Sequence, residues 1–357
     1  MSMIVIVGAG MMGSAMSFPA TDNGHKVRLI GTPLDRDIIE HAARTGEHPT
    51  LRRRLPAGIE YHQVEALADA IKGAHLLICG VSSFGVDWFA ERVLPLVPPE
   101  LPVLAVTKGM LDMPDGRLIP YPAHYEELTG GRLSLNAVGG PCTSYELADR
   151  DQTHVTFCGR DIGTLRRIRA MLETGYYHIS LSTDVTGVEC AVAMKNAYAL
   201  GVTLAVGLSE RLEGVGGRQH YNSQAALFGQ SIREMRRLLR LTGGHDDNIM
   251  LGAGDLYVTV FGGRTRRIGT LLGRGVPFAQ AMEELGGITL ESVVIATRTA
   301  RAVRALIARG QATPDEFPLL LHIDEILNRG AAVDIPWDQF ETEYDAADDA
   351  GNNCVLH

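Results

Sequence analysis

Hydrophobic positions divide the chain into two parts with different periodicity. Up to about residue 183, short apolar runs rich in β-branched residues alternate with longer stretches of helical spacing. The strand-like runs cover residues 3–7, 26–30, 76–81, 103–106, 133–138, 154–158 and 177–182. Helical stretches lie between them, for example as far as Asn23 and over residues 161–173. Strands that alternate with helices in this way predict an α/β fold with a doubly wound parallel sheet.

After Thr183 the pattern changes to long helical stretches. We therefore predict two domains, residues 1–183 with the sheet and residues 184–357 with helices only. The first helix of the second domain is expected over residues 187–208, followed by a polar loop over residues 209–221 and a helix over residues 222–242. The acidic, polar tail from Asp345 is expected to fray.

The helix expected over residues 187–208 is apolar on nearly every side, which is typical of a buried helix. Its apolar run has roughly the length of a membrane span, but Lys195 and Asn196 lie well inside it, so a buried helix of a soluble protein is the better interpretation. Desolvation lowers the pKa of a buried lysine toward the range useful for acid–base chemistry. The alternative is a lysine whose ammonium group reaches the surface from a partly exposed helix.

Composition narrows the possible functions. The net charge of −9 argues against nucleic acid or an anionic membrane as a partner, although it leaves room for a local basic pocket for a small anion. Five cysteines without close pairing suit a reducing compartment, and the N-terminus has no signal-peptide pattern, so we expect a cytoplasmic protein. The twelve histidines form no HExxH or Cys/His cluster, so we expect no metal site.

A glycine motif, GAGMMG, follows the first apolar run directly and opens a helical stretch. This G-x-G-x-x-G pattern between a strand and a helix predicts a Rossmann-type dinucleotide site. Gly8 would permit the tight turn, Gly10 would let the backbone approach a pyrophosphate, and Gly13 would let helix and strand pack closely. Free N–H groups at the start of the helix would favour the anion.

The strand over residues 26–30 ends in Gly31-Thr32, without the acidic residue that would bind the adenosine ribose of NAD. Asp35 and Asp37 come a few residues later, with Arg36 between them. Arg36 is either a ligand for the 2′-phosphate of NADP or an exposed loop arginine. NAD and NADP therefore both remain possible cofactors.

Ligands of such sheets bind beyond the carboxyl ends of the strands. The turns at residues 81–83, 107–109 and 139–142 are therefore informative. Lys108 lies just past a strand end, where it would reach a bound anion or carbonyl unless it is an ordinary surface lysine. In the second domain, a glycine turn with three nearby arginines over residues 262–267 is either an anion site or a cationic helix start without a ligand.

Several motifs then fall in one order. They are VGAGMMG, HPTLRRRLP, VTKGM, GGPCTSYELA, STDVTGVECAVAMKNAYAL, NSQAAL, GAGDLYVT, FGGRTRRIG and FPLLLHIDEIL. Through this ordered set of motifs, the chain resembles the NAD(P)-dependent glycerol-3-phosphate dehydrogenase family over nearly its whole length. The resemblance implies a second domain of the 6-phosphogluconate-dehydrogenase-like type, NAD or NADP as cofactor, a small phosphorylated substrate and a homodimer. The reaction would be reversible reduction of dihydroxyacetone phosphate to sn-glycerol 3-phosphate, in glycerophospholipid metabolism.

The resemblance also implies residue roles. Lys195 would be the general acid/base, Lys108 would contact the substrate from the cofactor domain, and Asp255 would bind the substrate and hold Lys195. The other substrate-binding residues would be Asn196, Thr259, Arg264, Thr265, Gly140 and Cys142, with Arg264 gripping the phosphate. The cofactor-binding residues would be Gly8, Gly10, Met11, Met12, Gly13, Thr32, Arg36, Ser82, Phe84, Lys108, Ser144, Arg264 and Glu291.

Three features depart from the family pattern around the substrate. Thr265 stands where asparagine is usual, Cys142 stands where serine is common, and the loop at residues 209–221 is longer than expected. They keep open a second hypothesis, the same chemistry on another polyol phosphate or hydroxy acid. A third hypothesis, a dinucleotide-binding sensor without catalysis, is disfavoured because Lys108, Lys195 and Asp255 are all retained.

Overall fold

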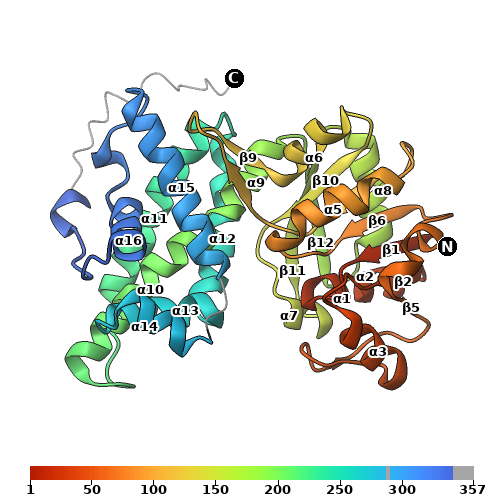
Figure 1. Cartoon of the computed structure of the whole chain (residues 1–357), viewed down its shortest axis with the longest axis horizontal. Helices are drawn as coiled ribbons and strands as arrows, with labels where there is room; N and C mark the ends of the chain where they lie inside the picture. Colours follow the sequence, from red (N-terminus) through yellow and green to blue (C-terminus); the bar gives the residue numbers. More distant parts are fainter. Residues whose placement is uncertain (287–289, 341–357) are drawn as a thin grey trace.

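A computed structural model describes residues 1–286 and 290–340. It has two parts, a half built on a β-sheet and a half built of helices, side by side in Figure 1. The tail from Asp345, for which we expect fraying, lies outside the described residues. The α/β architecture followed by helices is the one that the hydrophobic pattern predicts.

The first half contains an eight-stranded sheet in the order β12-β11-β10-β7-β6-β1-β2-β5. Its strands are β1 (Met3–Val7), β2 (Lys26–Ile30), β5 (Glu60–His62), β6 (Leu76–Cys79), β7 (Val103–Ala105), β10 (Leu135–Gly139), β11 (Thr153–Gly159) and β12 (Tyr177–Ser182). Helices pack on its faces, as a doubly wound sheet requires, because both faces of its central strands are buried. The covering helices are α1 (Met11–Ala15), α2 (Ser17–Asp22), α3 (Arg36–Thr45), α4 (Leu67–Ala70), α5 (Val86–Arg92), α6 (Tyr121–Thr129), α7 (Ser144–Ala148) and α8 (Ile162–Leu172).

The sheet is not wholly parallel, which corrects the sequence-based prediction. Strand β11 runs antiparallel to β10, and every other neighbouring pair is parallel. The connection over residues 140–152 contains only the short helix α7, so the chain turns back at the carboxyl end of β10 instead of crossing to the other end. That turn keeps residues 140–144 beside the neighbouring strand ends.

Strand β1 marks the point where the order of strands reverses. The chain adds β2 and β5 on one side of β1 and then crosses to β6 on the other. Gly8, which follows β1, has a φ of +108°, and a Cβ there would lie 2.6 Å from the carbonyl carbon of Gly80, which follows β6. This close approach requires glycine, and it opens a crevice at the carboxyl ends of the two strands.

Local structure differs from the prediction at several places. The helical stretch expected as far as Asn23 is two short helices, α1 and α2, and Pro19 in α2 has no N–H to continue an α-helical ladder through Met16. Two small hairpins were not predicted. They are β3 (Glu47–His48) with β4 (Arg53–Arg54), and β8 (Met110–Asp112) with β9 (Leu118–Pro120).

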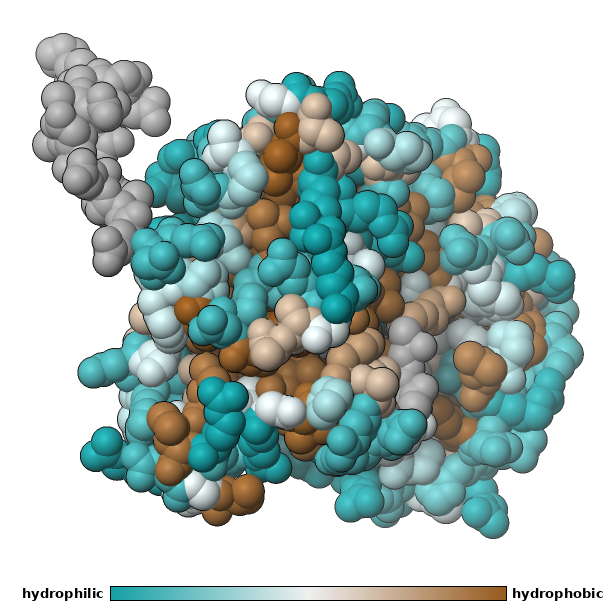
Figure 2. Space-filling view, turned by 60° about the vertical axis from the view of Figure 1, so that its left-hand side comes forward, coloured by the Kyte–Doolittle hydropathy of each residue, from teal (hydrophilic) through white to brown (hydrophobic). Residues whose placement is uncertain are grey.

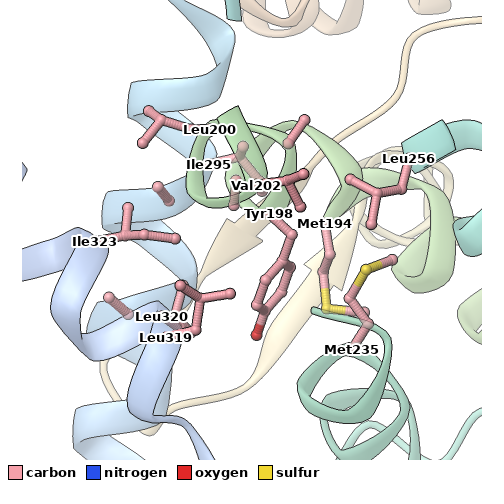
Figure 3. Packing of buried hydrophobic residues seen from close by; sticks show 14 of the residues in the cluster. Met194, Tyr198, Leu200, Val202, Met235, Leu256, Ile295, Leu319, Leu320 and Ile323 are labelled. Atoms are coloured by element: carbon pink, nitrogen blue, oxygen red, sulfur yellow. The ribbon is translucent and has the colours of Figure 1, made fainter. Parts of the chain in front are cut away.

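The helical half is organised around α10 (Lys195–Glu213), which is preceded by the separate helix α9 (Val185–Ala193). The other helices are α11 (Tyr221–Leu241), α12 (Ile249–Val260), α13 (Gly263–Gly273), α14 (Phe278–Glu284), α15 (Glu291–Ala308) and α16 (Pro318–Arg329). Figure 3 shows Tyr198 of α10 among side chains from α11, α12, α15 and α16. Of the most apolar window in the stretch from Val185 to Glu213, 83% is buried in the protein, as predicted for a core helix.

Two predicted boundaries in this half are wrong. The stretch over residues 187–208 is helical but is interrupted at Met194, a residue with φ −68° and ψ −20° that separates α9 from α10. The polar loop expected over residues 209–221 is shorter, because α10 continues to Glu213 and α11 begins at Tyr221. A buried Ser209, whose hydroxyl donates to the carbonyl of Ala205, extends the helix beyond the apolar run.

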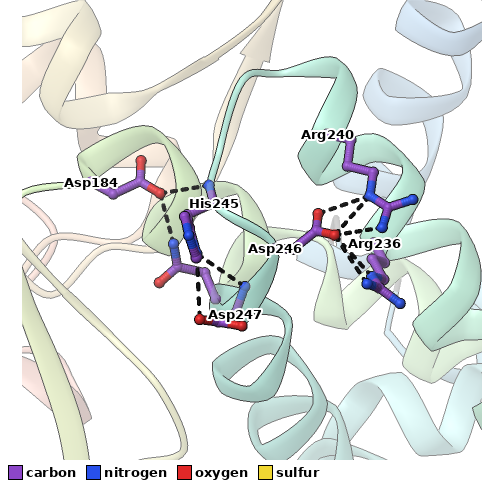
Figure 4. Close-up of polar contacts among 7 residues, drawn as sticks. Asp184, Arg236, Arg240, His245, Asp246 and Asp247 are labelled. Atoms are coloured by element: carbon purple, nitrogen blue, oxygen red, sulfur yellow. Dashed lines mark hydrogen bonds and ion pairs between the residues drawn. The ribbon is translucent and has the colours of Figure 1, made fainter. Parts of the chain in front are cut away.

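Asp184 fixes the beginning of α9 (Figure 4). Its carboxylate accepts hydrogen bonds from the backbone N–H of Gly187 and of His245, at 2.8 Å each, and from the side chain of Asn248 at 2.7 Å. Asp246 in the same turn pairs with Arg236 and Arg240 of α11. These contacts tie α9 to the beginning of α12, so the helices that flank Lys195 and carry Asp255 are held together.

Candidate active site

The crevice beside β1 contains two adjoining cavities. One, of about 360 Å³, is lined by Gly10, Met11, Met12, Gly80, Val81, Ser82, Val106, Thr107, Lys108, Cys142, Ser144, Lys195, Asn196 and Glu291. The other, of about 310 Å³, is lined by Gly8, Gly10, Thr32, Pro33, Leu34, Asp35, Gly80, Val81, Ser82, Phe84, Gly85 and Trp88. They share Gly10 and residues 80–82, so they form one continuous cleft across the carboxyl ends of the strands.

The glycines have the geometry that their motif predicts. A Cβ at Gly13 would lie 2.2 Å from the carbonyl oxygen of Gly8, so only glycine permits this packing. A Cβ at Gly10 would meet nothing within 4 Å, because its position faces the open cleft. The backbone at Gly10 is therefore the part of the loop that a pyrophosphate can approach.

Three charged side chains meet at one end of the cleft. The carboxylate of Asp255, on α12, forms ion pairs with the ammonium groups of Lys108, after β7, and of Lys195, at the start of α10. Lys108 also donates a hydrogen bond of 2.7 Å to the carbonyl of Gly140. The Asp255 side chain is 1% exposed, against 16% and 15% for the two lysines, so the carboxylate lies beneath the lysines and their ammonium groups reach the cavity.

Burial lowers the pKa of Lys195, and the nearby positive charge of Lys108 lowers it further, while Asp255 opposes both effects. A lysine with a pKa closer to neutrality both donates and accepts a proton more readily in the physiological range. Burial also raises the pKa of the Cys142 thiol to about 11, so this cysteine lines the cavity as a neutral group.

Most of the predicted site residues lie at the cleft. Of these residues, the cavity linings include Lys108, Lys195, Gly8, Gly10, Met11, Met12, Thr32, Ser82, Phe84, Cys142, Ser144, Asn196 and Glu291. Asp255, Gly140 and Gly13 lie behind these linings, where Asp255 and Gly140 contact Lys108 and Gly13 packs on Gly8. Glu291 begins α15 and accepts a hydrogen bond of 3.1 Å from the hydroxyl of Ser83. This contact joins the helical half to the sheet half across the cleft.

Other predicted residues are not brought to these linings. Arg36 forms an ion pair with Glu65 outside the cleft. Arg264 is exposed at the first turn of α13, with Thr265 beside it, and neither lines the two cavities. Thr259 lies one turn after Asp255 on α12 and donates its hydroxyl to the Asp255 carbonyl at 2.7 Å.

Several residues at the site were missed by the sequence reasoning. Gly80 lines both cavities and packs against Gly8, and a glycine inside the strand-like run over residues 76–81 was a usable signal. Asp35 accepts a hydrogen bond from the N–H of Ala9 inside the glycine motif, at 3.1 Å. Glu189 has no role in the sequence-based prediction, but its carboxylate is fully buried near Lys108 and Asp255.

Glu189 predicts a pH dependence of stability. Its carboxylate has no hydrogen-bond partner within the described residues, and burial raises its pKa from 4.5 to about 8, although Lys108 lowers it. Between these two pH values the carboxyl group is ionised in the unfolded state but still protonated in the folded state. The free energy of unfolding therefore falls by about 3–5 kcal/mol as the pH rises through this window. In urea unfolding, Glu189→Gln is expected to remove this loss and to be more stable than the wild type at pH 8.5 but not at pH 5. The exposed Glu100→Gln is the control, and an equal pH dependence in Glu189→Gln and wild type would contradict the prediction.

The cleft is not the largest cavity. A hollow of about 890 Å³, lined by residues such as Ser2, Ala74 and Pro102, lies at the amino ends of β1, β6 and β7. Ligands of doubly wound sheets bind at the opposite, carboxyl ends. Among residues 1–286 and 290–340, no three His, Cys, Asp or Glu side chains form a group that would hold a metal ion.

A glycine loop at the reversal point of the sheet, facing a carboxylate shared by two lysines, defines a dinucleotide-dependent oxidoreductase. Comparison with known families agrees. Residues 3–163 match the N-terminal model, and residues 184–337 the C-terminal model, of NAD-dependent glycerol-3-phosphate dehydrogenase. The chain belongs to this family, whose members are NAD(P)-dependent oxidoreductases acting on CH–OH groups.

Individual relatives give the same result. The NADP(+)-dependent glycerol-3-phosphate dehydrogenase of Archaeoglobus fulgidus is 32% identical over 284 residues, which cover 79% of this chain and 83% of the relative. A glycerol-3-phosphate dehydrogenase [NAD(P)+] of Koribacter versatilis is 29% identical over 339 residues, covering 92% and 94%. The solved structure of the Plasmodium falciparum glycerol-3-phosphate dehydrogenase has a TM-score of 0.81 at 19% identity, covering 96% of both chains, and supports the fold alone.

Proposed function

We propose that the protein reversibly reduces dihydroxyacetone phosphate to sn-glycerol 3-phosphate with NADH or NADPH, and that Lys195 is the general acid/base. The observation that carries this proposal is the carboxylate of Asp255 shared by Lys108 and Lys195 at the end of the dinucleotide cleft. The relatives named above supply the substrate, since their names describe this reaction. The product would serve glycerophospholipid metabolism.

The nicotinamide would supply the hydride that reduces the ketone carbon. Lys195 would donate the proton that the carbonyl oxygen gains, and it would remove the same proton in the oxidative direction. Burial and the charge of Lys108 lower the pKa of Lys195, which makes release of its proton to the substrate oxygen easier than from an ordinary lysine. Asp255 would hold the ammonium in position, and its negative charge would favour the return of a proton to Lys195 after each transfer.

Lys108 would orient the substrate. An ammonium group has three donors, and here two are directed to Asp255 and the Gly140 carbonyl. The remaining donor is available to the carbonyl or a hydroxyl of the substrate. A fixed donor beside the reacting carbonyl lowers the entropic cost of the reaction, because the ketone is held in the orientation for hydride attack.

The cleft fits a dinucleotide. Gly10 offers an open backbone surface for the pyrophosphate, and the adjoining cavity has an apolar wall from Pro33, Leu34, Phe84 and Trp88 against which a flat base would pack. The lining of this second cavity contains no lysine or arginine. Both NAD and NADP therefore remain candidates, and Arg36 would need to leave Glu65 before it could bind a 2′-phosphate.

Arg264→Ala tests the predicted phosphate clamp. Arg264 is exposed at the first turn of α13, where its guanidinium is available to an anion. As the proposed phosphate clamp it acts in ground and transition states alike, so its removal should raise KM for dihydroxyacetone phosphate at least about tenfold, with a smaller change in kcat. Steady-state kinetics at saturating dinucleotide measure this. Arg267→Ala, at another exposed arginine of the same helix, is the control. Unchanged KM in Arg264→Ala would place the phosphate elsewhere.

The second candidate is the same chemistry on another polyol phosphate or hydroxy acid. It is favoured by Cys142, which lines the cavity where serine is common in the family, and by Thr265. A panel of phosphorylated and unphosphorylated ketoses, assayed with NADH and with NADPH, distinguishes the two. If larger ketose phosphates are turned over as well as dihydroxyacetone phosphate, the first proposal fails.

We also propose a homodimer in the cytoplasm, with the domain boundary at residues 183/184. The boundary is supported by the end of β12 at Ser182 and the beginning of α9 at Val185. Free thiols at the described cysteines suit a reducing compartment. Figure 2 shows brown, hydrophobic residues among hydrophilic ones on the side of the helical half. In this half Leu212, Val215 and Tyr221 are 73%, 76% and 72% exposed, and exposed large side chains of this kind favour association.

A further inference from the structure

The motif HPTLRRRLP contributes to the family resemblance but has no part in the proposed chemistry. It covers residues 48–56 and forms a turn between α3 and β5, in which His48 and Arg53 pair across the small β3–β4 hairpin. His48 is 0% exposed and lies beneath the glycine motif. A fully buried histidine in a connecting loop needs partners for both ring nitrogens, because an unpaired buried polar group is costly.

Both ring nitrogens of His48 have partners. Nδ1 accepts hydrogen bonds from the backbone N–H of Thr50 at 3.2 Å and of Leu51 at 3.0 Å. Since two donors face Nδ1, the ring proton must be on Nε2, which lies 2.8 Å from the carbonyl oxygen of Ala9 and donates to it. Burial lowers the pKa of His48, which keeps the ring in this neutral form.

Both backbone polar groups of Ala9 are thus hydrogen-bonded. Its N–H donates to the carboxylate of Asp35, and its carbonyl accepts from His48. Ala9 stands between Gly8, which has a φ of +108°, and Gly10, whose surface faces the cleft. Glycine flanks leave a loop with many accessible conformations, so these contacts restrict the peptide units that would face the pyrophosphate.

The turn is itself anchored. Leu51 is fully buried, and the guanidinium of Arg53 makes two hydrogen bonds, of 2.6 and 2.8 Å, to the carboxylate of Asp149 at the end of α7. α7 follows the loop of Gly140 and Cys142 and packs against α1. His48 therefore connects an anchored turn to the glycine loop by a hydrogen bond.

We propose that His48 is a positioning residue for the dinucleotide, acting through its hydrogen bond to the Ala9 carbonyl, which holds the glycine loop in the conformation that receives the pyrophosphate. This inference rests on the proposed use of NAD(P)H. Preorganisation of this kind increases affinity, because the loop loses less conformational freedom on binding. Loss of the contact should therefore weaken dinucleotide binding more than it slows the chemical step.

Two substitutions separate the two ring nitrogens. In His48→Asn the side-chain oxygen replaces Nδ1 and keeps the turn, but the side chain is too short to reach Ala9. In His48→Gln the amide nitrogen replaces Nε2 and keeps the bond to Ala9, but Thr50 and Leu51 lose their acceptor. The same pair of changes at His41, on α3, provides the controls.

The test is the dissociation constant of NADH and NADPH, measured by calorimetry on each full-length variant, together with KM and kcat. We expect His48→Asn to weaken binding about 5- to 20-fold, to raise KM for the dinucleotide accordingly and to lower kcat much less. His48→Gln should bind more tightly than His48→Asn although its turn is weakened.

Wild-type affinity in His48→Asn would overturn the inference, as would equal or weaker binding in His48→Gln, since both would assign His48 to the turn alone. Failure of the proposed function has a different signature. In that case the wild-type protein itself would bind neither dinucleotide, or would bind one without reducing dihydroxyacetone phosphate.

Discussion

Lys195→Ala is expected to lower kcat for reduction of dihydroxyacetone phosphate by about 10²–10⁴-fold, the usual contribution of a positioned proton donor. The dissociation constant for the dinucleotide should stay close to the wild-type value, because the glycine loop and the second cavity lie on the other domain. Steady-state rates with both dinucleotides, combined with binding titrations, measure the two effects separately. Wild-type turnover in Lys195→Ala would remove α10 from the mechanism.

Lys195→Arg distinguishes charge from proton transfer. Arginine keeps a positive charge that can pair with Asp255, but its pKa lies too high for it to release a proton at neutral pH. We therefore expect Lys195→Arg to bind substrate better than Lys195→Ala and to remain nearly as slow. Lys72→Ala, an exposed lysine on the sheet half, is the control for a general effect of lost charge. Restored turnover in Lys195→Arg would assign Lys195 an electrostatic role without proton transfer.

Asp255→Asn is expected to have the second largest effect. Its carboxylate is 1% exposed and is shared by two lysines, so the variant leaves two adjacent ammonium groups without their common counter-charge. Removal of one partner of a buried pair costs about 3–5 kcal/mol, and the partial exposure of the lysines places this site toward the lower end. A loss of unfolding free energy should accompany a strong loss of kcat/KM.

The pH profile of Asp255→Asn carries a further signature. Asp255 is the group that raises the pKa of Lys195 against burial and Lys108, so its loss lowers that pKa further. Reduction requires the protonated amine, and the alkaline limb of its profile should therefore move to lower pH. Asp324→Asn, which removes the partner of Arg304 away from the cleft, should affect stability alone. An unshifted alkaline limb in Asp255→Asn would show that Asp255 does not control the Lys195 proton.

Local sequence was sufficient to predict the glycine motif and most strands of the sheet. Gly13 packs on the carbonyl oxygen of Gly8 within one strand–turn–helix unit, so the glycine spacing predicts this part of the geometry. The contact that requires glycine at position 8 comes instead from Gly80, which follows another strand. Apolar runs likewise predict the buried strands, because a strand covered on both faces has no polar positions. The direction of β11 was not predictable in this way, since it depends on where the connection over residues 140–152 turns back.

For the site residues, too, sequence motifs identified some features and only the tertiary structure showed others. Motif resemblance selected Lys108, Lys195 and Asp255, and their chemical roles stay predictions until the variants are measured. Only tertiary packing brings the three together, because they lie on three separate segments and the pairing forms where α10 and α12 meet the end of β7. The sequence by itself thus determined the glycine motif and its place between a strand and a helix, because the close packing of Gly13 on Gly8 lies within that unit. Tertiary structure decided the shared carboxylate, the buried Glu189 and the support from His48, because burial and charge at these residues come from elements distant along the chain.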